Sequence, residues 1–398
     1  MEIVKGCLQV NEDLSITGGA EIMVRQIGLE LSRRKLNVGL VSAHEFRDLT
    51  GLKEYIIPFF NGHYPSERIP ELAHSVIDIM DDQGYDLLHV YSVTNHELIQ
   101  EIAKSKPVFR SVYDSRPYCP IENRIKFQGN ICTEPVGVNC LECMEQFGIP
   151  EATRIGKLSQ TASGLESMES YRFIFTPSEY VRQQLILNKI PSQKLVVIPL
   201  FLAHTPVISH GVMESLVTAE ASDILFVGRL VEIKGIDELL SAFSLLENKY
   251  KLTVIGNRPS YVPSRDFEKE NQLNDRVKFL GWVDTNLIDA YYQRTRICVV
   301  PSIWPESFGL VGLHAMKNKK PVVAFNTGGI SEWLHDGENG YLIPRGDINL
   351  FAEKMRFLLE NPKKAEEMGE IGYQILSNQF TVKAHIDRLL HYYNEGLK

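Results

Sequence analysis

Glu306, in the stretch 301–344, is a residue whose type and position could serve binding or catalysis. This carboxylate follows the apolar strand predicted at Ile297–Val300, at the sheet edge where open α/β folds bind ligands. The intervening loop ends at Gly309, and a helix is predicted to begin directly after it, at Leu310–Lys317. The free N–H groups at a helix start favour an anion such as a phosphate. An ordinary strand–helix unit with a capping carboxylate explains the same pattern.

Two basic residues on a second loop, Arg229 and Lys234, have the spacing to bind a diphosphate. A strand is predicted before them at Asp223–Val227 and a helix after them at Ile236–Leu246. Arg can form paired hydrogen bonds with phosphate oxygens, whereas Lys acts as a point charge. Such a pair could stabilise the negative charge that builds on a leaving diphosphate. A solvated basic turn is the alternative.

A glycine pair, Gly18 and Gly19, lies between the strand predicted at Ile3–Val10 and the helix predicted at Glu21–Leu36. Because glycine lacks a Cβ atom, the pair lets a backbone or a ligand approach closely. An ordinary turn explains two loop glycines equally simply.

Asp114 follows the strand predicted at Val108–Tyr113 and could contact an acceptor hydroxyl. Tyr113 can form hydrogen bonds there but cannot accept a proton near neutral pH as a histidine can. A strand-end Asp that accepts hydrogen bonds from turn amides is an equally good interpretation. The nearby Arg116 could contact an anionic acceptor or belong to the solvated surface.

The stretch 116–148 is long, polar and without period, and it holds four of the six cysteines. Its C-x-x-C pair is typical of tetrahedral metal sites, and two upstream thiols could complete a structural zinc site. A disulfide or redox pair and free thiols are the alternatives. The four candidates are Cys119, Cys132, Cys140 and Cys143.

Composition limits the class of protein. The 398 residues are 44% hydrophobic and 23% charged, which is typical of a globular protein long enough for two domains. No apolar run is long enough to predict a spanning helix, and the polar N-terminus does not resemble a signal peptide. The net charge of −8 argues against a general nucleic-acid binder. We therefore expect a cytoplasmic protein.

The stretch 301–344 resembles the donor-binding signature of GT-B glycosyltransferases of the family 4 type, the retaining glycosyl transferases group 1. The matching positions are Glu306, Phe308, Gly309, Ala315, Met316, Pro321–Ala324 and Gly328–Gly329. The loop 228–235 and the Gly18-Gly19-Ala20-Glu21 loop resemble two further family motifs. Two positions depart from the pattern, because His314 stands where the family has a second Glu, and Tyr113 stands where many members have His.

The resemblance implies an α/β fold of two doubly wound Rossmann-like domains that face a cleft. The first, acceptor-side domain is expected at 1–205, with the cysteine-containing insertion 116–148. The second, donor-binding domain is expected at 206–381. The C-terminal helix 382–398 is expected to pack on the first domain.

The implied function is retaining transfer of a sugar from a nucleotide diphosphate sugar to an acceptor hydroxyl, on a glycan, a lipid-linked saccharide or a small metabolite. No catalytic metal is implied, because Arg229 and Lys234 would serve the diphosphate. The implied catalytic residues are Glu306, Arg229, Lys234 and Asp114. The implied donor-binding residues are Gly18, Gly19, Gly228, Arg229, Lys234, Val283, Glu306, Ser307, Phe308, Gly309, Leu310 and His314. The acceptor-side residues are Glu21, Tyr113, Asp114 and Arg116.

Two other functions fit the same resemblance. A non-catalytic relative would bind a nucleotide sugar or a partner transferase, and the departures at Tyr113 and His314 favour it. A sugar-nucleotide epimerase would need acid–base residues that the sequence does not identify. A lipid-linked acceptor would allow peripheral contact with the inner membrane face.

Overall fold

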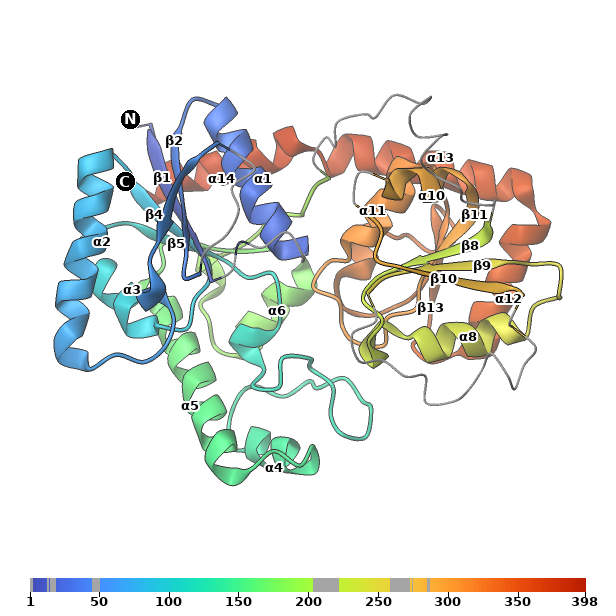
Figure 1. The fold of residues 1–398 in the computed structure, drawn as a ribbon, viewed down its shortest axis with the longest axis horizontal. Helices are drawn as coiled ribbons and strands as arrows, with labels where there is room; N and C mark the ends of the chain where they lie inside the picture. The colour runs from blue at the N-terminus through green and yellow to red at the C-terminus, as the bar shows by residue number, and fades with distance from the viewer. Residues whose placement is uncertain are drawn as a thin grey trace. The chain divides into compact units, whose positions relative to one another are not determined.

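A computed structural model describes residues 3–12, 14, 19–44, 51–202, 222–257, 273, 275–284 and 287–398. The chain divides into two compact units, one of Met1–Pro199 with Val382–Lys398 and one of Leu200–Thr381. Each unit is built on one parallel sheet with helices packed against it (Figure 1). In the described residues, no helix is long and apolar enough to cross a membrane.

The first unit contains a seven-stranded sheet in the order β3-β2-β1-β4-β5-β6-β7. Its strands are β1 Gly6–Asn11, β2 Asn37–Ser42, β3 Lys53–Ile56, β4 Leu87–Ser92, β5 Val108–Ser111, β6 Ile174–Thr176 and β7 Leu195–Val197. Its helices are α1 Gly19–Arg33, α2 Ile69–Gln83, α3 His96–Ile102, α4 Asn139–Gln146, α5 Glu151–Ser167, α6 Glu179–Leu187 and α14 Val382–Gly396. The central strands β1, β4 and β5 are buried on both faces, and most of the residues in them are apolar.

The second unit contains a six-stranded sheet in the order β10-β9-β8-β11-β12-β13. Its strands are β8 Ser222–Val227, β9 Leu252–Ile255, β10 Val277–Gly281, β11 Thr295–Val300, β12 Val322–Phe325 and β13 Gly340–Ile343. Its helices are α8 Ile236–Ser244, α10 Ile288–Gln293, α11 Leu310–Lys317, α12 Ile348–Glu360 and α13 Pro362–Gln379. The predicted fold class, two doubly wound parallel sheets, is confirmed.

Both sheets change the direction of their strand order at one point, between β1 and β4 in the first and between β8 and β11 in the second. Ligands of doubly wound folds bind beyond the carboxyl ends of the strands at such a point. In the second unit the loops that leave these strands are 228–235 and 301–309, which hold the predicted donor residues.

Several predicted bounds differ from the structure. The first strand begins at Gly6 and not at Ile3, and α1 ends at Arg33, before the predicted Leu36. Lys35 stops the helix because its φ of 68° is left-handed and cannot continue it. The predicted linker 201–221 lies almost wholly outside the described residues.

Candidate functional site

The two donor loops of the second unit are joined because β8 and β11 are neighbours in the sheet. Ile303 donates its backbone N–H to the carbonyl oxygen of Ile233 at 3.1 Å. Gly235, with φ 73°, makes the close approach possible, since a Cβ atom there would lie 1.8 Å from the carbonyl oxygen of Pro301. Backbone contacts therefore fix the two loops to one another without any contribution from side chains.

Lys234 and Glu306 form an ion pair at the centre of these loops. The Lys234 Nζ lies 2.6 Å from Glu306 Oε1, and the two side chains are 18% and 8% exposed. Ser302 donates its hydroxyl to the same oxygen at 2.6 Å. The Lys234 ammonium also lies 5.0 Å from the centre of the Trp304 ring, within cation–π range. The two motifs, 72 positions apart, thus meet in one buried polar cluster.

The cluster keeps Glu306 ionised. Burial alone would raise the pKa of this carboxyl, but the charge and hydrogen bond of Lys234, with the Ser302 hydroxyl, hold it below its usual value. A buried carboxylate can accept hydrogen bonds from the hydroxyl groups of a bound sugar.

A tryptophan fixes the start of α11. The buried Trp333 indole donates to the carbonyl oxygen of Phe308 at 2.6 Å. Gly309 then turns the chain into the helix with φ 93°, and Gly312 leaves room for the indole, since a Cβ atom there would lie 2.1 Å from the ring. The backbone amides at Phe308–Leu310 are consequently held at a helix N-terminus, where an anion is favoured.

The remaining predicted donor residues of the second unit lie around this centre. Arg229 is exposed on the loop after β8, and Gly228 begins that loop. Ser307 and Leu310 are half-buried on the loop before α11 and at its first residue. Val283 is half-buried just beyond β10.

His314 lies on α11 beside a carboxylate that the sequence did not indicate. Its Nδ1 is 3.7 Å from Asp289 Oδ1, and its ring stacks on Tyr292 at 5.8 Å. Burial would raise the pKa of Asp289, but His314, Lys317 and Asn318 lower it far below its ordinary value. The negative charge that the family pattern places at position 314 is therefore present nearby, on Asp289 of α10.

In the first unit, Gly19 starts α1 and Glu21 is half-buried in its first turn, whereas Gly18 lies outside the described residues. Asp114 Oδ1 accepts the backbone N–H of Arg116 at 2.9 Å, and Oδ2 accepts Arg116 Nε at 2.7 Å. Arg116 also reaches Glu12 at 3.4 Å. Burial raises the pKa of Tyr113 well above 10, so this phenol stays protonated. Asp114 is thus a turn-forming residue in this arrangement, as one of the two interpretations predicted.

A cavity of about 260 Å³ lies beyond the carboxyl ends of β1, β4 and β5, and we call it the Arg110 cavity. The acceptor-side residues Tyr113, Asp114 and Arg116 line it. Its other titratable lining residues are Glu12, Tyr91, His96, Arg110, Cys119, Glu122 and Lys157. The carboxylates pair with Arg116 or, for Glu122, with Lys157 at 3.8 Å.

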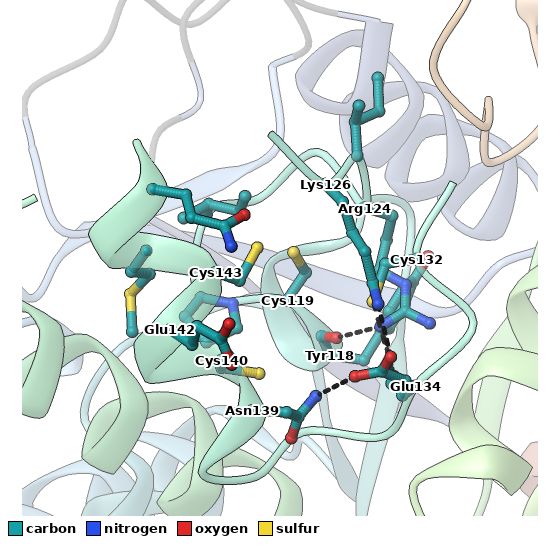
Figure 2. Close-up of a pocket in the computed structure, with 15 residues that line it drawn as sticks. Tyr118, Cys119, Arg124, Lys126, Cys132, Glu134, Asn139, Cys140, Glu142 and Cys143 are labelled. Atoms are coloured by element: carbon teal, nitrogen blue, oxygen red, sulfur yellow. Dashed lines mark hydrogen bonds and ion pairs between the residues drawn. The ribbon is translucent and has the colours of Figure 1, made fainter. Parts of the chain in front are cut away.

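The four predicted zinc ligands line a second cavity of the first unit, of about 160 Å³ (Figure 2). All four are free thiols. Arg124 and Lys126 flank them, and Lys126 pairs with Glu134. Within the described ranges no three His, Cys, Asp or Glu side chains come together closely enough to hold a metal ion. The cysteines therefore share a cavity without forming a metal site in this arrangement.

Sequence reasoning missed several residues of these sites. Ser302, Trp304 and Trp333 support Glu306 and its loop, but serine and tryptophan beside a proline-rich turn carry no distinctive signal. Arg110 did leave a signal, because an arginine interrupts the otherwise apolar strand β5. Asp289 could not be found, since its contact with His314 depends on how α10 packs on α11.

Part of the chain matches a family of known proteins. Residues 214–375 match the family described as glycosyl transferases group 1. A 41.2 kDa protein encoded in the cps region of Klebsiella pneumoniae is 37% identical over 36% of this chain and 38% of its own length. The capsular polysaccharide biosynthesis glycosyltransferase CapM of Staphylococcus aureus is 29% identical over 44% of this chain and 46% of its own. The chain thus spans less than half the length of these relatives.

A solved structure resembles the whole chain. The HepE protein of Anabaena in complex with UDP and glucose superposes with a TM-score of 0.68 at 17% identity, over 98% of this chain and 99% of its own. Residues 214–375 thus resemble the glycosyl transferases group 1, and the whole chain has the two-sheet GT-B fold.

Proposed function

We propose that the protein is a retaining glycosyltransferase that moves a sugar from a nucleotide diphosphate sugar to an acceptor hydroxyl. The observation that carries this proposal is the buried Lys234–Glu306 pair, which joins two family motifs at the switch point of the second sheet. The HepE complex with UDP and glucose supports a nucleotide-sugar donor. The similarity to CapM supports a saccharide acceptor.

Each donor residue has a defined role in this proposal. Arg229 and Lys234 stabilise the diphosphate as negative charge builds on it, so no metal ion is required for that purpose. Glu306 accepts hydrogen bonds from the sugar hydroxyls. The amides at Phe308–Leu310 bind phosphate oxygens at the start of α11.

The acceptor is proposed to bind in the Arg110 cavity of the first unit. Tyr113 supplies a neutral hydroxyl for orientation, since burial keeps its proton in place. Asp114 would accept a hydrogen bond from the reacting hydroxyl, which requires that it release part of its contact with Arg116.

Thermal unfolding with UDP, GDP, ADP and their sugars tests the donor site. A ligand at about 100 times its dissociation constant should add roughly 2.7 kcal/mol to the free energy of unfolding. Arg229→Ala is the most informative variant, because the exposed Arg229 can be removed without breaking the buried Lys234–Glu306 pair. It should abolish most of the stabilisation, whereas Lys363→Ala, an exposed lysine on α13, should leave it unchanged.

Product analysis then separates the rival functions. Release of nucleotide with glycosylated acceptor supports transfer. Conversion of the free nucleotide sugar to its epimer would identify an epimerase. Nucleotide binding without turnover would identify a non-catalytic relative, and the absence of any nucleotide effect on folded protein would contradict the donor site itself.

A further inference from the structure

Arg110 is a buried charge that has no opposite charge beside it among the residues that the structure describes. It lies on β5 with 4% of its surface exposed. Its Nη1 donates to the Tyr171 hydroxyl at 3.3 Å, and its guanidinium lies 5.7 Å from the centre of the Tyr171 ring. In the part of the chain that the structure describes, the Arg110 Nε has no hydrogen-bond partner and the guanidinium forms no ion pair.

The other charged side chains that line the Arg110 cavity form ion pairs with one another. Glu12 and Asp114 pair with Arg116, and Glu122 lies 3.8 Å from Lys157. A guanidinium cannot lose its proton in a protein, so Arg110 cannot relieve its burial by becoming neutral. An unpaired buried charge costs several kcal/mol, and a ligand that brought a negative group would offset that cost.

A second polar group in the same cavity is also unpartnered. The His96 Nδ1 is buried and has no hydrogen-bond partner among the described residues. Burial and the charge of Arg110 lower the pKa of His96 to about 3, so the ring is neutral and can donate or accept one hydrogen bond. Gly164 leaves room beside it, because a Cβ atom there would lie 2.9 Å from His96 Nε2.

We propose that the Arg110 cavity binds the anionic group, a carboxylate or a phosphate, of a charged acceptor. This inference rests on the proposed transferase function and narrows its substrate class. Arg110 supplies the charge and His96 a neutral hydrogen bond, while Tyr113 and Asp114 line the same cavity, where a hydroxyl of the same molecule would react. Arginine suits planar or tetrahedral oxyanions because its N–H groups match their oxygen spacing.

The first test measures stability with inorganic phosphate against chloride at equal ionic strength. Phosphate should raise the unfolding midpoint of the wild type and not that of Arg110→Met. Without phosphate, Arg110→Met should be more stable than the wild type by about 2–4 °C, because an uncompensated charge has been removed. Arg33→Met, which removes a largely exposed arginine of α1, should behave as the wild type. A less stable Arg110→Met, or equal phosphate effects in both proteins, would overturn the proposal.

The second test compares glucose with glucose 6-phosphate and glucuronate as acceptors, with products identified by mass spectrometry. A charged acceptor should be preferred by the wild type, and Arg110→Met should reduce that preference roughly tenfold or more. Equal transfer to glucose and to its charged forms would overturn the acceptor assignment, and so would a phosphate effect on stability without any charged-acceptor preference.

A measurement of nucleotide binding distinguishes a failure of the anion-site proposal from a failure of the transferase proposal. Nucleotide-induced stabilisation should be the same in Arg110→Met and in the wild type, because Arg110 belongs to the first unit, whereas Arg229, Lys234 and Glu306 belong to the second. If no nucleotide binds but Arg110→Met still loses the phosphate effect, the anion site stands and the transferase function fails.

Discussion

At the scale of single residues, His314 is the position where this chain departs most clearly from the pattern of the family that it resembles. A neutral imidazole offers one hydrogen bond where a carboxylate offers two acceptor oxygens. We expect His314→Glu to strengthen nucleotide binding or to change which nucleotide binds best, measured by calorimetry with UDP, GDP and ADP. The new carboxylate would face Asp289, so some loss of stability should accompany the change.

His314→Gln is the matched control, because it keeps one hydrogen bond and adds no charge. Its nucleotide affinity should remain near that of the wild type. If His314→Glu leaves both affinity and nucleotide choice unaltered, position 314 does not contact the ribose in this protein.

The role of a residue could be predicted where one loop motif indicates it. A contact between residues of two different loops could not be predicted. Lys234 and Glu306 could each be assigned to a donor site from the sequence. Their mutual pairing could not, because it depends on β8 and β11 being neighbours in the sheet. For the same reason the environment of Arg110 could not be predicted from the sequence, since Tyr171, to which its side chain donates a hydrogen bond, lies 61 positions away.

At the scale of elements, the buried parallel strands were the easiest to predict, because both faces are apolar. The edge strand β3 was missed, since its sequence KEYI is polar and its side chains are partly exposed. Helix α13 was missed for a related reason, because its polar face outweighs the few residues that it buries. The positions of loops in the sequence could be predicted, but their conformations could not. These depend on contacts such as the hydrogen bond from Trp333 to the carbonyl oxygen of Phe308.

The segment 116–148 gives the prediction at this scale. A zinc ion would hold four thiolates about 2.3 Å away, so binding must draw together side chains that only share a cavity in Figure 2. If zinc binds, about one equivalent should copurify, and replacing Cys140 and Cys143 with Ser should remove it. Cobalt substitution would show the number of thiolate ligands in its absorption spectrum. Metal-free protein with six titratable thiols would contradict the zinc prediction, and a lower thiol count without metal would indicate a disulfide.

At the scale of the whole molecule, histidines with lowered pKa values make stability depend on pH, and His89 and His385 add to the effect of His96. His89 contacts the Tyr393 hydroxyl at 2.5 Å and Ser111 at 3.0 Å, and burial lowers its pKa to about 3. His385 contacts the carbonyl oxygen of Pro199 at 2.7 Å, and burial lowers its pKa to about 4. Both are neutral when folded, whereas the unfolded chain takes up protons near the ordinary value of 6.5.

The free energy of unfolding should therefore fall as the pH drops below about 6.5, until about pH 4 for the part due to His385 and until about pH 3 for the part due to His89. Each histidine contributes a slope of up to about 1.4 kcal/mol per pH unit in that window, because the unfolded state binds one more proton. Urea titrations of the wild type and His385→Gln at pH 5 and pH 7 measure this. The variant should lose part of the difference between the two pH values, and an unchanged difference would exclude His385 as a cause.

Helix α14 has a consequence for the order in which the protein can be made. It belongs to the first unit, although residues 200–381 of the second unit precede it in the chain. Its Tyr393 reaches His89 of β4, and its Asn394 accepts the backbone N–H of Val4 at 2.9 Å. During synthesis, the first unit must therefore wait with this surface uncovered until the second has been translated. The first unit is therefore begun first and completed last. Until α14 has been translated, the apolar side chains that α14 covers need protection from aggregation.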